Sequence, residues 1–541
     1  MDRLFPSVQL YILSGIVVGL STVYFLKSRK SSNLPPGPPR KPIIGNALDF
    51  DSLRPWHRFA EWRDQYGDIV YAEALGKPMI ILNTLEVTND LLEKRASNFT
   101  NRPNLVVVGE MMRVNEGMAM LPYGPAWRKQ RRLVNIGLSI TAVKKYHLLQ
   151  SQITAMFLQS LVERPRKYAD ELRLAAGRIV ISVTYGLSAK TPDDLYITEA
   201  EECLGIVTRG SMPGAFMVDL IPALRHLPSW FPGVTFHKAG KEGREKIQRL
   251  VTRPFNYVKS QMEAGTARPS LALDCLENYE SLNEKATSVE EKEHTIRWAT
   301  GVMYAAGGET TYTTVLNFIL ACLDPFALYS RINTNAKPPG VKYPRVLKKA
   351  QAEYDSVIGG GRLPTIDDRA SLPFISACVK EAARWHVALP IARETSEEEE
   401  YRGYYIPKNT IVIPNVWCMA QDTVSGIPTE DFAPERHMPE YVGDKVATDP
   451  TKFAFGFGRR VCPGRFLGEN SVFLLIASII ATMDITPEQD AQGNDINPNP
   501  EYAGGLVAHP KPFPVKITPR SQNVSAMVAD IVNSIEDFDK H

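Results

Sequence analysis

The chain has 541 residues, of which 44% are hydrophobic and 23% are charged, and its formal net charge is +2. This length allows one large domain plus a further segment, and the balance excludes a disordered or fibrous chain. A net charge near zero gives no reason to expect a nucleic-acid partner. The cysteines have no paired spacing, which argues against a disulfide framework and favours a reducing compartment. They are Cys203, Cys275, Cys322, Cys378, Cys418 and Cys462.

The N-terminus predicts a membrane anchor followed by a hinge. Residues 8–26 carry no charged side chain and, at about 1.5 Å per residue, are long enough to cross a bilayer. The run is longer than the apolar region of a usual cleaved signal peptide, so we expect residues 1–30 to be a retained anchor. Lys27 and the basic residues after it predict that the bulk of the chain faces the cytosol. The prolines of residues 31–45 favour a stiff, extended hinge.

The next segment predicts a hairpin, an apolar loop and a basic helix. Strand-like residues 69–72 and 79–82 lie on either side of a Gly-Lys-Pro turn. Residues 99–123 are irregular and too apolar for an ordinary surface loop. A basic helix follows, on which Trp127 and Arg131 share one face because they are four residues apart.

Residues 141–295 are mostly helical and carry little functional signal. Within them, residues 210–233 are conspicuously apolar, so they form either core or a surface that contacts the bilayer and admits lipophilic substrates. At the other end of the chain, residues 521–541 are acidic and polar, and we expect a loose tail.

A long apolar helix is predicted from His294 to Leu323, and the run Ala306-Gly-Gly-Glu-Thr-Thr311 interrupts its pattern. Adjacent glycines inside a helix cost about 1 kcal/mol each relative to alanine. They are expected where the backbone opens or where another group approaches closely. A buried Glu309–Thr310 pair needs partners. The run therefore indicates either close helix packing or a groove with an acid–alcohol pair.

The most specific stretch is the glycine-rich loop that ends at Cys462. Pro463 suits the first turn of the apolar helix that follows, so Cys462 is expected at a helix N-terminus, where a thiolate is favoured. A thiolate there could bind haem iron, bind zinc or act as a nucleophile, and a lone cysteine is most often structural. Zinc would need further ligands at short spacing, and none flank this cysteine.

The spacing Phe455-x-x-Gly458-x-Arg460-x-Cys462-x-Gly464 resembles the haem-binding signature of the cytochrome P450 monooxygenases. Other motifs of this family occur in the family's order. They are Trp127-x-x-x-Arg131, the Gly-Gly-Glu309-Thr310 run, Glu381-x-x-Arg384 and the Pro-Glu-Arg436 element.

This resemblance implies a mainly α fold with a smaller β region, and a haem-thiolate catalytic domain over residues 46–520. The implied metal ligand is Cys462, bound to the iron of haem b. The implied cofactor-binding residues are Trp127, Arg131, Arg393, Phe455, Gly458, Arg460 and Gly464, with Arg393 as the candidate for a second propionate contact. The implied proton-delivery residues are Glu309 and Thr310, and the implied buried structural network is Glu381, Arg384 and Arg436.

The resemblance also implies an activity, with partners. One oxygen atom of O2 would be inserted into a C–H bond of a lipophilic small molecule, using electrons from NADPH through a separate NADPH–cytochrome P450 reductase. The motifs and hinge look most like fungal enzymes of secondary metabolism at the endoplasmic reticulum membrane. A terpenoid is the favoured substrate, with an aromatic or indole metabolite next, and Glu110 or Glu116 could meet an amine.

Two other functions stay open at this point. One is a haem-thiolate isomerase or dehydratase that does not use O2, although such relatives tend to lack the Glu309–Thr310 pair. The other is a non-catalytic haem-binding protein, which would need neither the anchor nor that pair.

The sequence departs from the family pattern in two places. Residues 386–393 look about two residues short and lack the usual Pro-His ending. Residues 323–340 lengthen a connection that is usually a few residues long, which indicates an insertion or a mispredicted splice site.

Overall fold

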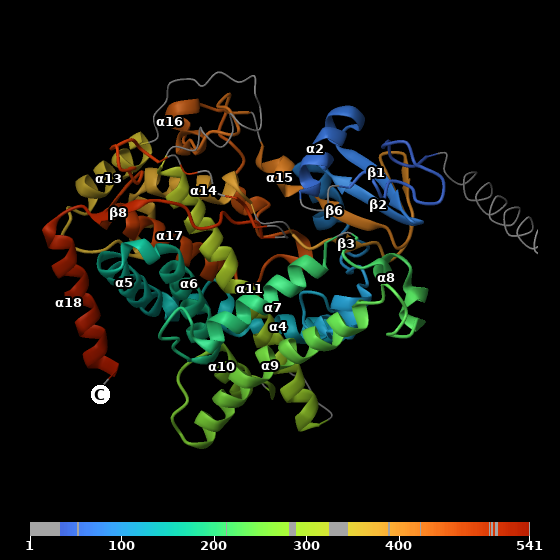
Figure 1. The fold of residues 1–541 in the computed structure, drawn as a ribbon, viewed down its shortest axis with the longest axis horizontal. Helices are drawn as coiled ribbons and strands as arrows, with labels where there is room; N and C mark the ends of the chain where they lie inside the picture. Colours follow the sequence, from blue (N-terminus) through green and yellow to red (C-terminus); the bar gives the residue numbers. More distant parts are fainter. Residues whose placement is uncertain are drawn as a thin grey trace, which may run out of the picture.

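The computed structural model in Figure 1 describes residues 33–539, apart from 51–53, 213, 281–287, 324–343, 388–389, 422–423, 497, 499–500 and 504–506. Its helices are α2 (Pro55–Tyr66), α3 (Leu85–Asn89), α4 (Pro125–Leu138), α5 (His147–Glu163), α6 (Tyr168–Tyr185), α7 (Leu195–Gly210), α8 (Met217–Leu220), α9 (Phe236–Glu263), α10 (Leu271–Asn278), α11 (Val289–Ala321), α13 (Pro344–Val357), α14 (Pro373–Trp385), α15 (Val416–Ala420), α16 (Pro439–Val442), α17 (Arg465–Thr482) and α18 (Gln522–Asp539). Its strands are β1 (Ile69–Ala74), β2 (Lys77–Leu82), β3 (Arg393–Glu394), β4 (Glu399–Tyr401), β5 (Tyr404–Ile406), β6 (Ile411–Pro414), β7 (Met483–Thr486) and β8 (Lys516–Pro519).

The fold is mainly α with a smaller β region, as the sequence predicts. The larger part is a stack of helices, and the four-stranded sheet lies to one side of it with α2 and α15 (Figure 1). Strand order in this sheet is β1-β2-β6-β3. The predicted hairpin is confirmed as the antiparallel pair β1–β2, while β2 runs parallel to β6 and β6 antiparallel to β3.

Helix α11 runs through the centre of the helical part. It contacts α4, α6, α9, α14 and α17, and most of its C-terminal half is buried. It continues without a break through the run that the sequence marks as an interruption. The two glycines there serve close packing, because a Cβ on Gly307 would lie 2.8 Å from Val180 and one on Gly308 would lie 3.5 Å from the Cα of Gly177 in α6.

Among the described residues, α17 is the single helix that is long and apolar enough to cross a membrane. It is instead a core helix, since 72% of it is buried inside the protein. Its neighbours include α5, α11, α13 and α14. The anchor predicted for residues 1–30 lies outside the described residues.

The proline-rich segment is attached to the β region rather than free. The carbonyl oxygen of Pro36 accepts from the N–H of Tyr71 at 2.9 Å, and that of Asn33 accepts from Tyr405 at 2.7 Å. Gly37 packs so closely on β1 that a Cβ there would lie 1.9 Å from the Tyr71 oxygen. The described part of the expected hinge is therefore docked along the sheet.

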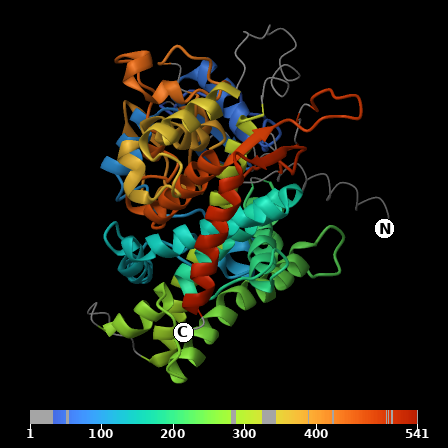
Figure 2. The same ribbon diagram turned by 90° about the vertical axis from the view of Figure 1, so that its left-hand side faces the viewer.

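The expectation of a loose C-terminal tail is wrong. Residues 522–539 form α18, which packs along α5 and is drawn in red in Figure 2. Val524, Val528 and Val532 are buried, and their spacing of four places them on one face of the helix. The acidic composition of residues 521–541 made this apolar face of the helix hard to recognise from the sequence.

The apolar segment 210–233 forms surface more than core. It contains α8 and a short 3-10 helix, and among its described residues only Gly210 and Val218 are buried. Trp230 is 79% exposed, and Met217 is 50% exposed.

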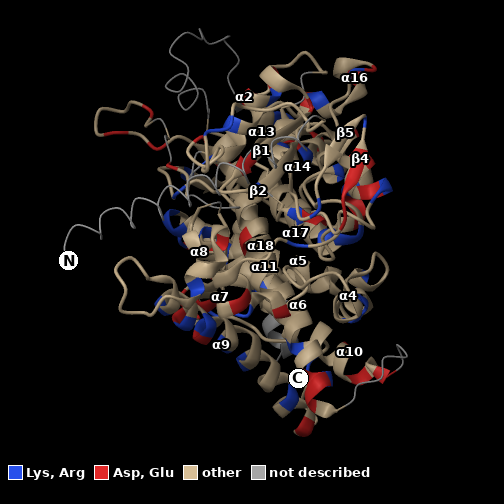
Figure 3. Ribbon diagram, turned by 90° about the vertical axis from the view of Figure 1, so that its right-hand side faces the viewer, with Lys and Arg blue, Asp and Glu red and all other residues tan. Residues whose placement is uncertain are grey.

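On the face shown in Figure 3, basic and acidic residues are interspersed along α7 and α9, and β4 is acidic.

Candidate functional site

The loop before α17 has a backbone that only glycine fits at one point. Gly458 has φ +54°, and a Cβ there would lie 2.1 Å from the carbonyl oxygen of Leu92. The N–H of Cys462 donates to the carbonyl oxygen of Phe455 at 2.8 Å, which closes the loop. These contacts hold Cys462 at a fixed place beside α17.

The helix starts later than the sequence predicts. Gly464 is the N-cap of α17 and Arg465 its first residue, so Pro463 precedes the helix rather than opening it. Burial raises the pKa of the Cys462 thiol. A hydrogen bond from the Gly464 backbone and the charges of Arg131 and Arg465 lower this pKa, but the effect of burial is larger. The expected thiolate is thus not favoured by the protein alone. A bound metal ion would favour it, because a coordinating thiol is deprotonated.

Cationic side chains gather around this loop, and none of them forms an ion pair with a described carboxylate. Arg131 of α4 donates to the carbonyl oxygen of Val461 at 2.6 Å, and Arg393 of β3 donates to that of Phe457 at 2.7 Å. Arg460 donates to backbone carbonyls of the apolar loop at 2.7–3.0 Å. Their acceptors are Thr100, Met118 and Leu121.

A fourth arginine, Arg102, completes this cluster, and the sequence reasoning missed it. It donates to the carbonyl oxygens of Ala119, Ile391 and Ala392 at 2.6–2.8 Å. Its position in an apolar loop with no acidic neighbour is the signal that could have found it. We call Arg102, Arg131, Arg393 and Arg460 the arginine cluster.

The arginine cluster has little compensating negative charge in the described part of the chain, where the carboxylate of Glu93, which accepts from the N–H of Gly458 at 2.6 Å, acts on Arg393 through its charge. No described carboxylate pairs with any of its members. Burial, and then the charge of Arg460, lowers the pKa of Arg393 to about 9. Burial, and then the charges of Arg393 and Arg460, lowers the pKa of Arg102. An anionic ligand with two acidic groups would relieve this repulsion.

Trp127 lies beside the arginine cluster. Its indole Nε1 donates to the carbonyl oxygen of Met118 at 3.1 Å, and the guanidinium carbon of Arg460 lies 4.9 Å from the centre of its ring. The predicted partners Trp127, Arg131 and Arg460 are therefore brought together around one loop.

These residues fit haem b. The thiol of Cys462 can bind iron, and the arginine cluster offers cationic donors to the two propionate carboxylates.

Glu309 and Thr310 are adjacent in α11 but have different surroundings. Thr310 Oγ1 donates to the carbonyl oxygen of Ala306 at 3.4 Å, on a face of the helix where Ala306 is exposed. Glu309 lies between His509 and α6. Its Oε1 is 3.0 Å from His509 Nδ1, and its Oε2 is 3.7 Å from Arg173 Nε.

The surroundings of Glu309 act on its pKa in opposite directions. Burial raises its pKa, and the Arg173 charge opposes this rise. Burial lowers the pKa of His509 to about 4, so the imidazole is neutral at pH 7. A cavity of about 30 Å³, room for about one water, is lined by Arg173, Glu201 and Glu309. No sequence motif pointed to Arg173 or His509.

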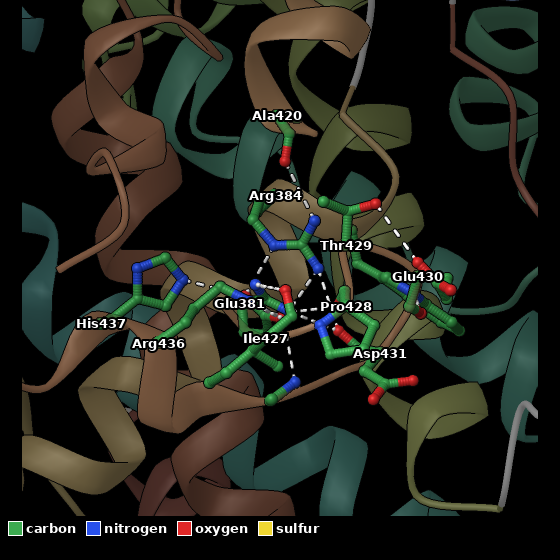
Figure 4. A network of polar contacts seen from close by, with 12 residues as sticks. Glu381, Arg384, Ala420, Ile427, Pro428, Thr429, Glu430, Asp431, Arg436 and His437 are labelled. Atoms are coloured by element: carbon green, nitrogen blue, oxygen red, sulfur yellow. Dashed lines mark hydrogen bonds and ion pairs between the residues drawn. The ribbon is translucent and has the colours of Figure 1, made fainter. Parts of the chain in front are cut away.

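Glu381, Arg384 and Arg436 meet in one fully buried network (Figure 4). Glu381 accepts two hydrogen bonds from Arg384 at 2.8 Å and one from Arg436 at 2.9 Å. Its Oε2 also lies 2.9 Å from Nε2 of His437, which the sequence reasoning missed. Other N–H groups of both arginines donate to backbone carbonyl oxygens, such as that of Asp431.

A second, larger cavity of about 370 Å³ lies between the four-stranded sheet, α2, the apolar loop and the 211–220 segment. We call it the sheet-side cavity. Ile391 and Ala392 line it, and their carbonyl oxygens accept from Arg102. The sheet-side cavity therefore adjoins the arginine cluster.

Comparisons with known proteins agree with this geometry. The family model described as Cytochrome P450 matches residues 35–336 and 341–517. The chain is 38% identical to cytochrome P450 monooxygenase claR of Ampulloclitocybe clavipes over 535 residues, which cover 97% of this chain and 94% of that relative. It is 34% identical to cytochrome P450 monooxygenase COX2 of Coprinopsis cinerea, with 97% of each chain covered. The gap in the family match falls within the 323–340 segment, most of which lies outside the described residues.

The Glu381 network generates a stability prediction. Glu381→Gln keeps the shape but leaves Arg384 and Arg436 buried without an anion, so we expect a loss of roughly 3–5 kcal/mol of stability. Thermal unfolding at pH 7 measures it, and Glu440→Gln, an exposed change in nearby α16, is the control.

The pH dependence follows from the same residue. Burial alone would raise the pKa of Glu381, but Arg384 first and then His437 and Arg436 hold it well below its ordinary value of about 4.5. Its contribution is therefore present above that value and is lost as the pH falls below it. The gap between wild type and Glu381→Gln should shrink in acid. A gap that stays constant from pH 7 to pH 3 would contradict the assignment.

Proposed function

Since the chain belongs to the cytochrome P450 monooxygenases, we propose that it holds haem b at Cys462 and hydroxylates a lipophilic small molecule. The observation that carries the proposal is the arginine cluster beside Cys462, in which Arg393 and Arg460 are buried and no member forms an ion pair with a described carboxylate. A cation cluster of this kind needs an anionic ligand, and haem supplies both the carboxylates and the metal for the thiol.

Each residue of the loop has a role in this proposal. Cys462 would bind the iron, and Gly458 allows the close backbone path of the loop. Phe455 closes the loop through its carbonyl oxygen. The arginine cluster and Trp127 lie where they can hold the propionates. The bound haem supplies activation of O2, so that one oxygen atom enters a C–H bond of the substrate and the other leaves as water.

We assign proton handling to Glu309 and Thr310. Glu309 has a raised pKa and lies beside a water-sized cavity that Arg173 and Glu201 also line, so it can take up protons from the solvent side. The Thr310 hydroxyl lies on the accessible face of α11, where it can donate a hydrogen bond to bound oxygen. The two residues thus act in sequence on adjacent positions of one helix.

The substrate belongs in the sheet-side cavity, whose walls are mostly apolar. A lipophilic molecule such as a terpenoid suits it, with an aromatic or indole metabolite as the next choice. Met212 and Leu220 of the exposed apolar segment also line the cavity. In this proposal the segment 210–233 would admit substrate from a bilayer at the endoplasmic reticulum, to which residues 1–30 would anchor the chain.

Electrons would come from NADPH through a separate cytochrome P450 reductase. A basic surface for that partner lies next to the Cys462 loop. Arg128 and Arg459 are both exposed, and their guanidinium carbons lie 5.7 and 5.3 Å from the centre of the Tyr123 ring. Basic side chains beside the loop favour docking of an acidic protein surface.

The ligand assignment predicts an absorption band. The reduced carbon-monoxide complex of the wild type should absorb where thiolate-ligated haem absorbs, because the sulfur sets the electronic state of the iron. Cys462→His should move the band to the imidazole-ligated position, while Cys418→Ala, which removes another buried cysteine, should leave it in place. A band that Cys462→His does not move would refute the assignment.

The role of Thr310 predicts a change in how the electrons from NADPH are divided between product and hydrogen peroxide. Thr310→Ala removes the hydroxyl but leaves the haem site intact, so haem content and the carbon-monoxide band should not change. Hydrogen peroxide should rise, and product formed per NADPH oxidised should fall by at least about tenfold. Thr311→Ala is the matched control, since the Thr311 hydroxyl also donates to its own helix, at the carbonyl oxygen of Gly307. If both variants keep the wild-type ratio, Thr310 is only a packing residue.

A further inference from the structure

The sheet-side cavity contains one carboxylate that the function above leaves unused. Glu394 follows Arg393 in the short strand β3. Because successive side chains of a strand point to opposite faces, the two residues serve different sites. Arg393 donates to the carbonyl oxygen of Phe457 in the Cys462 loop, whereas Glu394 lines the cavity.

The register of the sheet defines what surrounds Glu394. Its cross-strand partner is Ile411 of β6, which in turn pairs with Met79 of β2. All three residues line the cavity, and so does Ile413, two positions along β6. Glu394 is therefore a polar side chain beside Met79, Ile411 and Ile413, and Lys77, two positions from Met79 on β2, is a second charged residue on this side of the sheet.

The other polar side chains of the lining are mostly occupied. Lys77 Nζ donates to the carbonyl oxygen of Asp219 at 2.7 Å, and the Asp219 carboxylate accepts from the N–H of Val106 at 2.6 Å. Asn104 donates to Glu110 at 2.6 Å, and Asn415 donates to Asn83 at 2.9 Å.

Glu394 differs from these residues, because its carboxylate has no hydrogen-bond or ion-pair partner among the described residues. Two other acids that the sequence suggested as contacts for a substrate amine are paired instead. Glu110 Oε2 lies 2.8 Å from Arg225, and Glu116 Oε2 lies 2.8 Å from His294.

Glu394 is only partly buried, so its free carboxylate can accept a hydrogen bond from whatever fills the cavity. The partial burial of Glu394 raises its pKa, and the Lys77 charge opposes this rise. An incoming molecule with a hydroxyl group would provide the missing donor, while its apolar body would cover Met79, Ile411 and Ile413.

We propose that Glu394 is the polar anchor of the substrate site and selects apolar molecules that carry a hydroxyl group. This inference rests on the proposed function, since it takes the sheet-side cavity as the place where substrate binds. It narrows the substrate class from any lipophilic molecule to one that already bears a hydrogen-bond donor away from the carbon to be oxidised.

The test uses two rigid probes that differ in one donor. They are 1-adamantanemethanol and its methyl ether, which keeps the oxygen but cannot donate. Binding to the haem-loaded protein is measured by equilibrium dialysis and, independently, by the spin-state change of the haem absorption. The wild type should bind the alcohol roughly tenfold more tightly than the ether, since hydrogen bonds to charged groups are among the stronger ones.

Variants then test whether Glu394 causes the preference for the alcohol over the ether. Glu394→Leu should remove it by weakening binding of the alcohol alone, and Glu394→Gln, which keeps the shape and an acceptor, should retain part of it. Ile411→Val is the matched control, because loss of a methylene from the same wall should weaken both probes equally and leave their ratio unchanged.

Three results would overturn the inference: equal binding of both probes by the wild type, an unchanged ratio in Glu394→Leu and Glu394→Gln, or no binding of either probe. The carbon-monoxide band separates this failure from failure of the proposed function. If the band is that of thiolate-ligated haem and the ratio does not depend on Glu394, only the anchor is wrong. If the band is absent, the haem site itself is wrong.

Discussion

Several guanidinium groups lie close together without a described ion-pair partner, and this is the constraint on which the site depends. Arginine keeps its charge in proteins, so the arginine cluster cannot relieve its repulsion by losing protons. Backbone carbonyls satisfy some of its N–H groups, yet they supply no net negative charge. An anionic ligand at the arginine cluster would supply the negative charge that these contacts lack.

The cluster also joins the two parts of the fold. Arg131 comes from α4, Arg393 from β3 of the sheet, Arg460 from the Cys462 loop and Arg102 from the apolar loop. A ligand held by all four would bind the helical part to the β region. The Glu381 network shows the contrasting case, since its buried arginines share a carboxylate of the protein itself and need no ligand. The first arrangement is built for binding, and the second for stability.

Sequence alone predicted the parts of this site that depend on local spacing. The loop ending at Cys462, the Trp127–Arg131 pair and Glu381–Arg384 are each set within one turn or one helix, and the order of motifs placed Arg436 with them. Residues that act through tertiary contact carried no such signal. Arg102 and His509 reach their partners only because distant segments fold together.

Other differences arise where composition hides geometry. The C-terminal helix escaped notice because three valines at a spacing of four lie among acidic residues. The thiol of Cys462 was expected to ionise at a helix N-terminus, but the helix begins three residues later and burial dominates. Glu394 could not be identified from the sequence. It stands out only because the structure gives most other polar side chains of the cavity a hydrogen-bond partner.

The central claim is that the arginine cluster is neutralised by the two carboxylates of haem. The most direct measurement compares thermal unfolding of the protein loaded with haem b and with its dimethyl ester, which keeps the iron and the ring but not the negative charges. The account predicts that haem b raises the unfolding midpoint clearly more than the ester does, and that Arg102→Met together with Arg460→Met reduces the difference. Equal midpoints for the two ligands in the wild type would contradict it.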